Sequence, residues 1–385
     1  MPVIDRIAAF APELTELRRD LHAHPELGFQ EVRTSGIVAE LLTKWGIETH
    51  TGIGKTGVVG VLKGRGGGRT VGLRADMDAL PIDERTNLAW SSKTPGVMHA
   101  CGHDGHTVML LGAARYLAET RDFDGTAIFI FQPAEEGLGG ARAMLAEKLL
   151  ERVPCDELYG MHNNPNAAPL AVGVKPGEAM AGADFFDFRI LGAGSHGAMP
   201  HQSKDPIVIA AALVGQLQTI VSRNVPATDP IVLSVTQIHA GAAYNVIPAE
   251  ATVSGTMRFF DPELAEMVRG RMRALAAGMA QAYDVEIELD IREIFDVLVN
   301  DEKLAHVMLD IAGEVVGAEN VSVTLKVRTG SEDFADMLRV VPGAYCTVGH
   351  AGSSPLHSDH YVLDDDILPV GASIYARLVE RRTAA

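Results

Sequence analysis

The sequence predicts an α/β protein with a largely parallel or mixed sheet, interrupted by a smaller ferredoxin-like α+β insert. Three observations predict this class. Strand-like and helix-like segments alternate from residue 58 to residue 131, which is typical of α/β folds. Near residue 182 the pattern changes to half-buried strands in the order β-α-β-β-α-β. From about residue 295 the first pattern resumes and runs to the end of the chain.

The amino-terminal part supplies the first elements of the larger domain. Apolar residues recur every three to four positions in 3–24 and 34–45, which predicts two amphipathic helices ended by His24-Pro25 and by Gly46. The next predicted elements are, in order, a strand over 58–62, a Gly-rich turn, a strand over 70–74, a helix over 108–120 and a strand over 126–131. The last of these strands is apolar throughout, as expected for a buried strand.

The insert begins with the alternating segment 184–191. Its further predicted elements are a helix over 205–221, strands over 231–238 and 249–259, a helix over 263–283 and a strand over 285–291. We therefore place the domain boundaries at 1–182, 183–294 and 295–385, with the first and third segments forming one domain.

The charge of the chain excludes two classes of partner. Its 385 residues include 33 Lys and Arg against 50 Asp and Glu, a net charge of −17. Such a field repels phosphate backbones and anionic lipid, so neither nucleic acid nor a membrane surface is expected as a partner. The sequence has only three cysteines, shows no signal-peptide pattern and contains no apolar run long enough to cross a bilayer. These features predict a cytoplasmic protein. The segments GKTGVVG and GRGGGR lack the context of phosphate-binding motifs, so nucleotide binding is not expected.

The strongest chemical motif is HACGHDGH at 99–106, just before an apolar helix. Cys, His and carboxylate side chains are the ligands that transition metals take in proteins. Cys101 and His103 are close enough in a short loop to reach one ion. The alternative is a polar loop with an incidental thiol.

Two pairs of acids follow predicted strands. Glu135 and Glu136 come after the strand 126–131, at the sheet edge where α/β sites form. One of them can bind a metal while the other takes a proton from water; a solvated surface pair is the alternative. Asp76 and Asp78 lie on one face of an extended segment, where one of them can orient a ligand. A turn cap is an equal alternative for these two acids.

Two further histidines follow apolar or glycine-rich segments. His162 closes the apolar stretch 158–162, and His357 lies in a loop bounded by Gly, Ser and Pro. Alone, each is more often structural than functional. Metal-type donors at four junctions of one α/β domain together favour a shared metal site.

The insert carries polar residues of its own. His196 lies beside glycine in a strand-to-helix loop, where an accessible imidazole can donate to an oxyanion. The competing interpretation of this loop is a helix cap by Ser203 or Asp205. Asn245 and Arg258 lie at strand ends, and Arg258 can hold a carboxylate with two hydrogen bonds, although a surface Arg is the more common outcome.

Taken together, these motifs resemble those of the aminoacylase and carboxypeptidase-type metallopeptidases, and in particular their hippurate hydrolase and indole-acetyl-amino-acid amidohydrolase subfamily. The matching segments span residues 18–361 in family order: RRDLHAHPELGFQE, GLRADMDALPI, MHACGHDGHTVMLLGAA, FQPAEEG, GMHNNP, GSHGAMPH, NVIPAEATVSGTMR, GSEDFADML and PLHSDHY. The resemblance implies a mixed-sheet catalytic domain with helices on both faces and an inserted ferredoxin-like α+β domain that serves as lid and dimerisation domain.

The resemblance also implies roles for single residues. Two divalent metal ions per chain would be bound by Cys101, His103, Glu136, His162 and His357. Glu135 would be the general base and acid, and Asp78 would support the site from beside the metals. His196, Asn245 and Arg258 match insert residues that reach the active site in relatives, the first two from the partner subunit of a dimer.

The implied activity is hydrolysis of the amide bond of N-acyl amino acids (hippurate-like, N-acetyl or indole-acetyl) to a carboxylate and a free amino acid. The implied assembly is a homodimer or homotetramer formed through the lid domain. A dipeptidase or desuccinylase of the same family is the alternative within this class. A thiol hydrolase with Cys101 as nucleophile, and a non-catalytic binding protein, are the rivals outside it.

Two features of the sequence bear on specificity and on the metal. A cysteine ligand suits zinc, whereas the His and carboxylate ligands also suit manganese, cobalt or nickel, so the residues leave the metal open. Asn164 stands where relatives often carry a bulky apolar residue, which leaves the acyl pocket undetermined. Cys346 lies in a segment that the family uses structurally.

Overall fold

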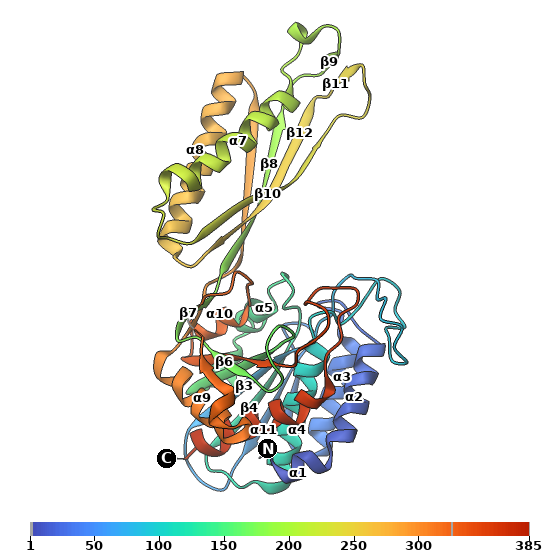
Figure 1. Cartoon of the computed structure of the whole chain (residues 1–385), viewed down its shortest axis with the longest axis vertical. Helices are drawn as coiled ribbons and strands as arrows, with labels where there is room; N and C mark the ends of the chain where they lie inside the picture. The colour runs from blue at the N-terminus through green and yellow to red at the C-terminus, as the bar shows by residue number, and fades with distance from the viewer. Residues whose placement is uncertain (1–2, 325, 385) are drawn as a thin grey trace. The chain divides into compact units, whose positions relative to one another are not determined.

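The computed structural model describes residues 3–324 and 326–384 and consists of two compact units. The first unit comprises Met1–Ala179, Leu298–Val327 and Glu332–Ala385, and the second comprises Met180–Val297 and Arg328–Ser331. Both ends of the chain belong to the first unit, so the second unit is an insertion in it (Figure 1).

An eight-stranded mixed sheet forms the centre of the first unit and confirms the predicted α/β class, with strand order β1-β2-β4-β3-β5-β16-β6-β15. Its strands are β1 (Glu48–Ile53), β2 (Gly57–Lys63), β3 (Thr70–Asp76), β4 (Thr126–Gln132), β5 (Glu157–Asn164), β6 (Val172–Val174), β15 (Val321–Val323) and β16 (Gly343–Gly349). The neighbours β4, β3, β5 and β16 run parallel to one another, so their carboxyl ends meet at one edge of the sheet. β3, β4 and β5 are buried along nearly their whole length, as expected for strands covered on both faces.

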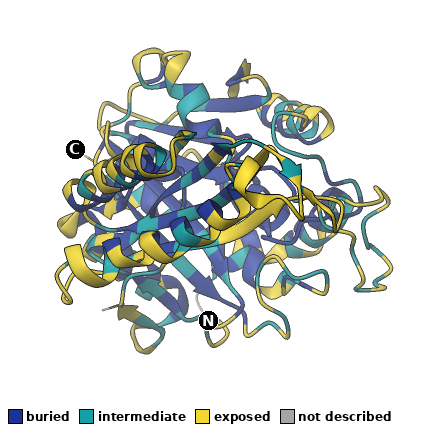
Figure 2. Ribbon diagram, turned by 90° about the horizontal axis from the view of Figure 1, so that it is seen from above, coloured by how far each residue is buried: buried dark blue, intermediate teal, exposed yellow. Residues whose placement is uncertain are grey.

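Helices cover this sheet, and the main core lies between it and α4, α9 and α11. The helices of the unit are α1 (Asp5–Ala9), α2 (Ala11–Ala23), α3 (Val32–Lys44), α4 (His103–Thr120), α5 (Gly140–Ala146), α6 (Leu149–Arg152), α9 (Glu302–Val316), α10 (Phe334–Leu338) and α11 (Leu368–Arg382). Figure 2 shows the pattern that results, with the strands largely buried and the outer faces of the helices exposed. Two short strands, β7 (Gly177–Met180) and β14 (Leu298–Asn300), pair separately.

Two helices of the first unit differ from the sequence expectation. The helix predicted over 3–24 is divided into α1 and α2, because Pro12 lacks an N–H group and cannot continue a helix from the preceding turn. The helix predicted from residue 108 begins earlier, at His103, after Gly102 in the left-handed conformation. The apolar pattern starts only at Val108 because the first turn is polar, although it is buried.

The second unit has the predicted β-α-β-β-α-β order. Its elements are β8 (Gly182–Leu191), β9 (Ser195–His196), α7 (Pro206–Asn224), β10 (Ile231–Ala240), β11 (Val246–Ile247), β12 (Glu250–Phe259), α8 (Pro262–Tyr283) and β13 (Glu286–Phe295). The four long strands form an antiparallel sheet in the order β10-β12-β8-β13, which is the ferredoxin-like arrangement. Short 3₁₀ helices occur in both units, at Pro200–Gln202, Ala318–Asn320 and Asp365–Ile367.

The two helices of the second unit pack against this sheet. Asp205 caps α7 by accepting a hydrogen bond from Ile207 N, so the capping alternative holds for this residue. Among the described residues, α7 is the one helix that is long and apolar enough to cross a membrane. Its buried residues, Leu213 and Leu217 among them, form part of the core of the second unit. Other apolar residues of α7, Ile207 and Val208, are exposed.

Candidate metal centre

The five residues predicted as metal ligands come from distant parts of the first unit and converge at the carboxyl edge of its sheet. They are Cys101 just before α4, His103 in the first turn of α4, Glu136 after β4, His162 in β5 and His357 in the loop that precedes α11. Their donor atoms form two groups whose members lie within 4.8 Å of one another: Cys101, His103 and His162, and Cys101, Glu136 and His357. Cys101 belongs to both groups, so its sulfur atom could contribute to binding an ion in either group.

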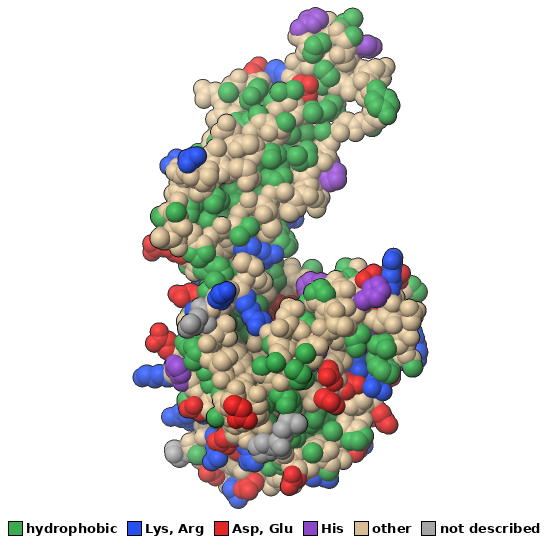
Figure 3. Space-filling model, in the orientation of Figure 1, with side chains coloured by type: hydrophobic (Ala, Val, Ile, Leu, Met, Phe, Trp, Pro, Cys, Tyr) green, Lys and Arg blue, Asp and Glu red, His purple; other side chains and the backbone are tan. Residues whose placement is uncertain are grey.

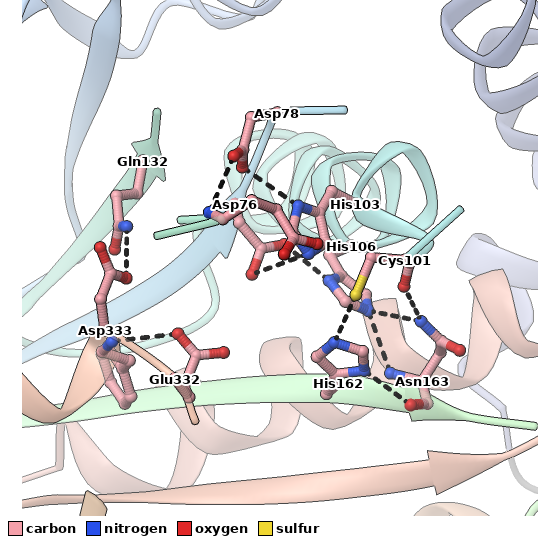
Figure 4. A network of polar contacts seen from close by, with 12 residues as sticks. Asp76, Asp78, Cys101, His103, His106, Gln132, His162, Asn163, Glu332 and Asp333 are labelled. Atoms are coloured by element: carbon pink, nitrogen blue, oxygen red, sulfur yellow. Dashed lines mark hydrogen bonds and ion pairs between the residues drawn. The ribbon is translucent and has the colours of Figure 1, made fainter. Parts of the chain in front are cut away.

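Short contacts within the groups show that the side chains face one another. Cys101 Sγ lies 3.4 Å from His162 Nε2, and Glu136 Oε1 lies 3.3 Å from His357 Nε2 (Figure 4 shows the first pair). The loop of His357 is tied to the cysteine segment, because His357 N donates to Ala100 O at 2.9 Å. Nε2 of His103 is buried and has no hydrogen-bond partner in the described chain. A bound cation would satisfy this nitrogen, and the mixed S, N and O donors suit a transition metal.

Neighbouring groups orient the imidazole rings. His103 Nδ1 lies 3.1 Å from Asp78 Oδ1, and His162 Nδ1 lies 2.7 Å from the backbone oxygen of Asn163. In each ring this leaves Nε2 directed at the other donors, which is how hydrogen-bond partners usually orient metal-binding histidines. Asp78 also accepts from Glu136 N at 3.0 Å, so one carboxylate holds two of the candidate ligands.

Burial and charge set the protonation of these donors. Burial lowers the pKa of His162 well below its usual value, so the ring is neutral and carries the lone pair that a metal needs. Burial also raises the pKa of the Cys101 thiol, and the Glu136 carboxylate adds to this. A cation at the site would reverse the effect on the thiol, since metals bind the thiolate form.

Behind the candidate ligands, His106 of the motif HACGHDGH pairs with Asp76; the sequence analysis named Asp76 as a residue that can orient a ligand but gave His106 no role. His106 Nδ1 lies 2.6 Å from Asp76 Oδ1, and His106 Nε2 accepts from Asn163 N at 3.0 Å. Asn163 in turn donates to Cys101 O at 2.6 Å. The available signal was the position of His106 one helical turn after His103, which became informative only once α4 was known to begin at His103.

Glu135, the predicted base, lies in a buried group of acids. One oxygen atom of Glu135 lies within 4.8 Å of oxygens of Glu332 and Asp333, and all three residues are buried. Burial, together with the charges of Glu332 and Glu136, raises the pKa of Glu135 well above its usual value. A raised pKa makes the Glu135 carboxylate a stronger proton acceptor than an exposed glutamate.

A buried arginine balances these acids. The guanidinium of Arg74 is fully buried and contacts Asp76 at 2.7 Å, Glu332 at 2.8 Å and Asp333 at 3.1 Å. Glu332 and Asp333 lie in GSEDFADML, one of the segments that resemble the family, for which the sequence predicted no residue roles. Arg74 lies inside a predicted strand, where no pattern indicates a charged partner.

The remaining predicted residues lie in the second unit. His196 and Asn245 are brought together there, because His196 pairs with Val246 in β9 and β11 and Gly197 N donates to Asn245 O at 2.8 Å. His196 is exposed, and its Nδ1 accepts from Ala198 N at 3.0 Å. Arg258 is half-buried in β12 and donates to Ser331 Oγ at 2.7 Å.

Comparison with known proteins places this geometry in a family. A sequence model of peptidase family M20/M25/M40 matches residues 72–381. A hippurate hydrolase of Campylobacter jejuni is 40% identical over 378 residues, 98% of each chain, and an N-acetylcysteine deacetylase of Bacillus subtilis is 39% identical over 96% of this chain and 97% of its own. A crystal structure from Bacillus subtilis, described as a dinuclear metal-binding peptidase of the M20 family, superposes with a TM-score of 0.80 at 36% identity and covers 97% of this chain and 98% of its own.

Proposed function

The chain belongs to peptidase family M20/M25/M40 and is a metal-dependent amidohydrolase of N-acyl amino acids, and we propose which of its residues bind the metals and which transfer the proton. The overall reaction splits the substrate amide into a carboxylate and a free amino acid. The observation that carries the assignment is the convergence of five metal-type donors beside one buried carboxyl group, Glu135.

We propose that the cofactor is two divalent metal ions. The residues that would hold them are His103 and His162 on one side, Glu136 and His357 on the other, and Cys101 facing both. When bound, the ions would polarise the amide carbonyl and lower the pKa of a water molecule. Cys101 favours zinc, while the other donors also accept manganese, cobalt or nickel.

Glu135 carries the proton in this proposal. One of its carboxylate oxygens accepts a proton from the water whose oxygen attacks the amide carbon. The same group then returns the proton to the amide nitrogen as the C–N bond breaks, so that the amino acid leaves with a neutral amine. Asp78 keeps His103 and the Glu136 backbone in place during this exchange.

The second unit supplies the proposed substrate contacts. His196 is exposed and free to donate to the oxyanion, Asn245 lies beside it, and Arg258 carries a guanidinium that suits the α-carboxylate of the leaving amino acid. Ser331, the present partner of Arg258, is a neutral group that a carboxylate can displace.

We also propose that the second unit joins two copies of the chain in a dimer. β10 is an edge strand whose second half is exposed, and large apolar side chains are exposed on it and on the start of α7: Ile207, Val208, Val232 and Ile238. Figure 3 shows hydrophobic side chains at the surface of this unit over α7. An open edge with apolar neighbours favours strand pairing with a second copy. Sedimentation should give a dimer, and Ile238→Lys should shift it towards monomer; a monomeric wild type would overturn the proposal.

We propose the cytoplasm as the compartment of the enzyme. The support is chemical, since Cys101, Cys155 and Cys346 are all free thiols and none is part of a disulfide.

A substrate panel tests the activity. Protein stripped by a chelator would be reconstituted separately with manganese, zinc, cobalt and nickel, and amino-acid release would be measured on N-acyl amino acids and dipeptides. We expect release from N-acyl substrates, restored by metal. Release from dipeptides alone would favour the peptidase alternative, and the acyl group cleaved fastest would define the acyl pocket.

A variant tests the role of Glu135. We expect Glu135→Gln to lower kcat by about 10²–10⁴-fold, the usual worth of general acid–base transfer, while metal content stays at the wild-type level. Glu147→Gln, a change of an exposed acid in the same region, serves as the control and should keep the wild-type rate. A near-normal rate for Glu135→Gln would overturn the assignment.

A further inference from the structure

The residue that precedes the proposed base has an unusual backbone. Ala134 is fully buried and has a φ of +53°, in the left-handed region that residues with a Cβ atom rarely adopt. Glu135 follows directly, so the conformation of Ala134 sets the direction in which the Glu135 side chain leaves the backbone. Such a conformation persists only where surrounding groups hold it.

Two hydrogen bonds and a close backbone contact hold Ala134. Its N–H group donates to Glu31 Oε1 at 2.8 Å, and its carbonyl oxygen accepts from Gly140 N at 3.0 Å. Gly28 packs against it so closely that a Cβ atom at Gly28 would lie 3.0 Å from Ala134 Cα. Of these two hydrogen bonds, the one that Glu31 accepts is made by a side chain.

Glu31 is itself fixed and fully buried. Its Oε2 atom accepts from the Thr56 hydroxyl at 2.5 Å, while Oε1 is used for Ala134, so both carboxyl oxygens have a donor. Burial raises the pKa of Glu31. A fully buried carboxyl group is costly to maintain unless its oxygens are hydrogen-bonded, as they are here. Glu31 lies at the start of α3, more than a hundred positions before Glu135 along the chain.

The peptide on the far side of Glu135 is held by a different acid. Glu136 N donates to Asp78 Oδ2 at 3.0 Å, and Asp78 is also the partner of His103. In the described part of the chain, the carboxyl group of Glu31 accepts from Ala134 and Thr56 and from none of the five candidate metal ligands. The two acids therefore have separate tasks: Asp78 serves the metal ligands, and Glu31 serves the backbone that leads into Glu135.

We propose that Glu31 is a positioning residue for Glu135: its carboxyl group holds the Ala134 peptide in the left-handed conformation and thereby aims the base. This inference rests on the proposed role of Glu135. A proton-transferring group must be held within a fraction of an ångström of its working position, so releasing the peptide should cost turnover more than substrate binding.

Three variants test the positioning role. Glu31→Leu keeps the bulk and removes both acceptors, and we expect kcat to fall by about 10- to 100-fold with KM and metal content little changed. Glu31→Gln keeps an acceptor for Ala134 N and should retain most of the wild-type kcat. Adding Ala134→Gly to Glu31→Leu should restore part of the lost kcat, because glycine adopts the left-handed conformation without a clamp.

A matched control separates positioning from general stability. Asp301 lies at the start of α9, and its carboxylate also accepts two backbone hydrogen bonds, from Lys303 N and Leu304 N at 2.9 Å each. These bonds hold the start of a helix that carries neither Glu31 nor Glu135. Asp301→Leu should lower thermal stability and keep the wild-type kcat.

The outcomes distinguish this inference from the proposed function. Wild-type kcat in folded Glu31→Leu, with Glu135→Gln inactive, would overturn the positioning role and leave the base assignment intact. A normal rate in Glu135→Gln would overturn both. Loss of metal from Glu31→Leu would also overturn the inference, because Glu31 would then act on the metal ligands. Should Glu31→Leu fail to fold, Thr56→Val is the second test, because it removes the hydrogen bond from the Thr56 hydroxyl to Glu31. A lower kcat of Thr56→Val at unchanged KM supports the positioning role, and an unchanged kcat overturns it.

Discussion

A buried histidine behind the candidate metal centre makes the stability of the first unit depend on pH. His22 is 2% exposed, and its Nδ1 lies 2.9 Å from Asp104 Oδ2, while its Nε2 lies 3.4 Å from Glu84 Oε1. Asp104 follows His103 in the first turn of α4, so this contact anchors the metal-binding segment to α2. Burial alone would lower the pKa of His22, but the Asp104 and Glu84 carboxylates outweigh it and raise this pKa to about 9.

The size of the effect follows from that pKa. The ordinary value is 6.5, and each pH unit of difference is worth about 1.4 kcal/mol, so the contact contributes about 3 kcal/mol. The folded protein holds the proton more tightly than the unfolded chain. The contribution is therefore fully present below about pH 6.5 and is lost as the pH rises through about 9. His22 also contributes to the lowered pKa values of Asp104 and Glu84, and that share is the same interaction, so it is counted once.

Urea unfolding at about pH 6 and about pH 9.5 measures this loss. The two tryptophans, Trp45 and Trp90, both lie in the first unit, so their fluorescence reports on it. A chelator in all samples keeps metal binding from adding its own pH dependence. In the wild type, the unfolding free energy should be lower at the higher pH than at the lower pH. In His22→Gln this difference should be smaller by about 3 kcal/mol. In His306→Gln, a change of an exposed histidine that serves as the control, the difference should equal that of the wild type. The same drop in His22→Gln and wild type would refute the reasoning.

Two other predictions concern the centre itself. Cys101 should be alkylated in protein stripped of metal and protected in metal-loaded protein, as measured by peptide mass mapping. The buried Cys346 is the control and should stay unlabelled in both samples. Equal labelling of Cys101 in the two samples would contradict its role as a ligand. Arg74→Met should destabilise the first unit by about 3–5 kcal/mol in urea unfolding, because it leaves buried carboxylates without their cation. A loss below about 1 kcal/mol would show that these carboxylates do not depend on Arg74.

The helices and strands that could be predicted from the sequence are those with a regular spacing of apolar residues. The alternation in 184–191 and 249–259 gave the strands of the second unit, because each of them has one buried and one more open face. β1 was missed because its residues ETHTGI form a mostly exposed edge strand without regular alternation. The early start of α4 was missed for the opposite reason, since its first turn buries polar side chains.

In the candidate site too, residues that are close together in the sequence could be predicted, and contacts between distant residues could not. The donors in HACGHDGH and the pair Glu135-Glu136 are visible because chemically distinctive residues stand together in the sequence. The distant partners of Arg74 were not visible, since Asp333 lies 259 positions away and a single Arg within an apolar strand carries no signal of what it will meet. The clamp on Ala134 was hidden in the same way, because nothing in FQPAEEG indicates a positive φ at an alanine.

The order of strands in the larger sheet has a consequence for synthesis on the ribosome. β16 lies between β5 and β6 and pairs with both, yet more than 150 residues separate it from either of them along the chain. Until β16 emerges, the apolar edge of β5 has no neighbour, whereas the second unit is almost wholly continuous in sequence and is complete much earlier. We therefore expect the inserted unit to fold first during translation. The nascent first unit would meanwhile expose an unpaired strand, which is the kind of surface that chaperones bind.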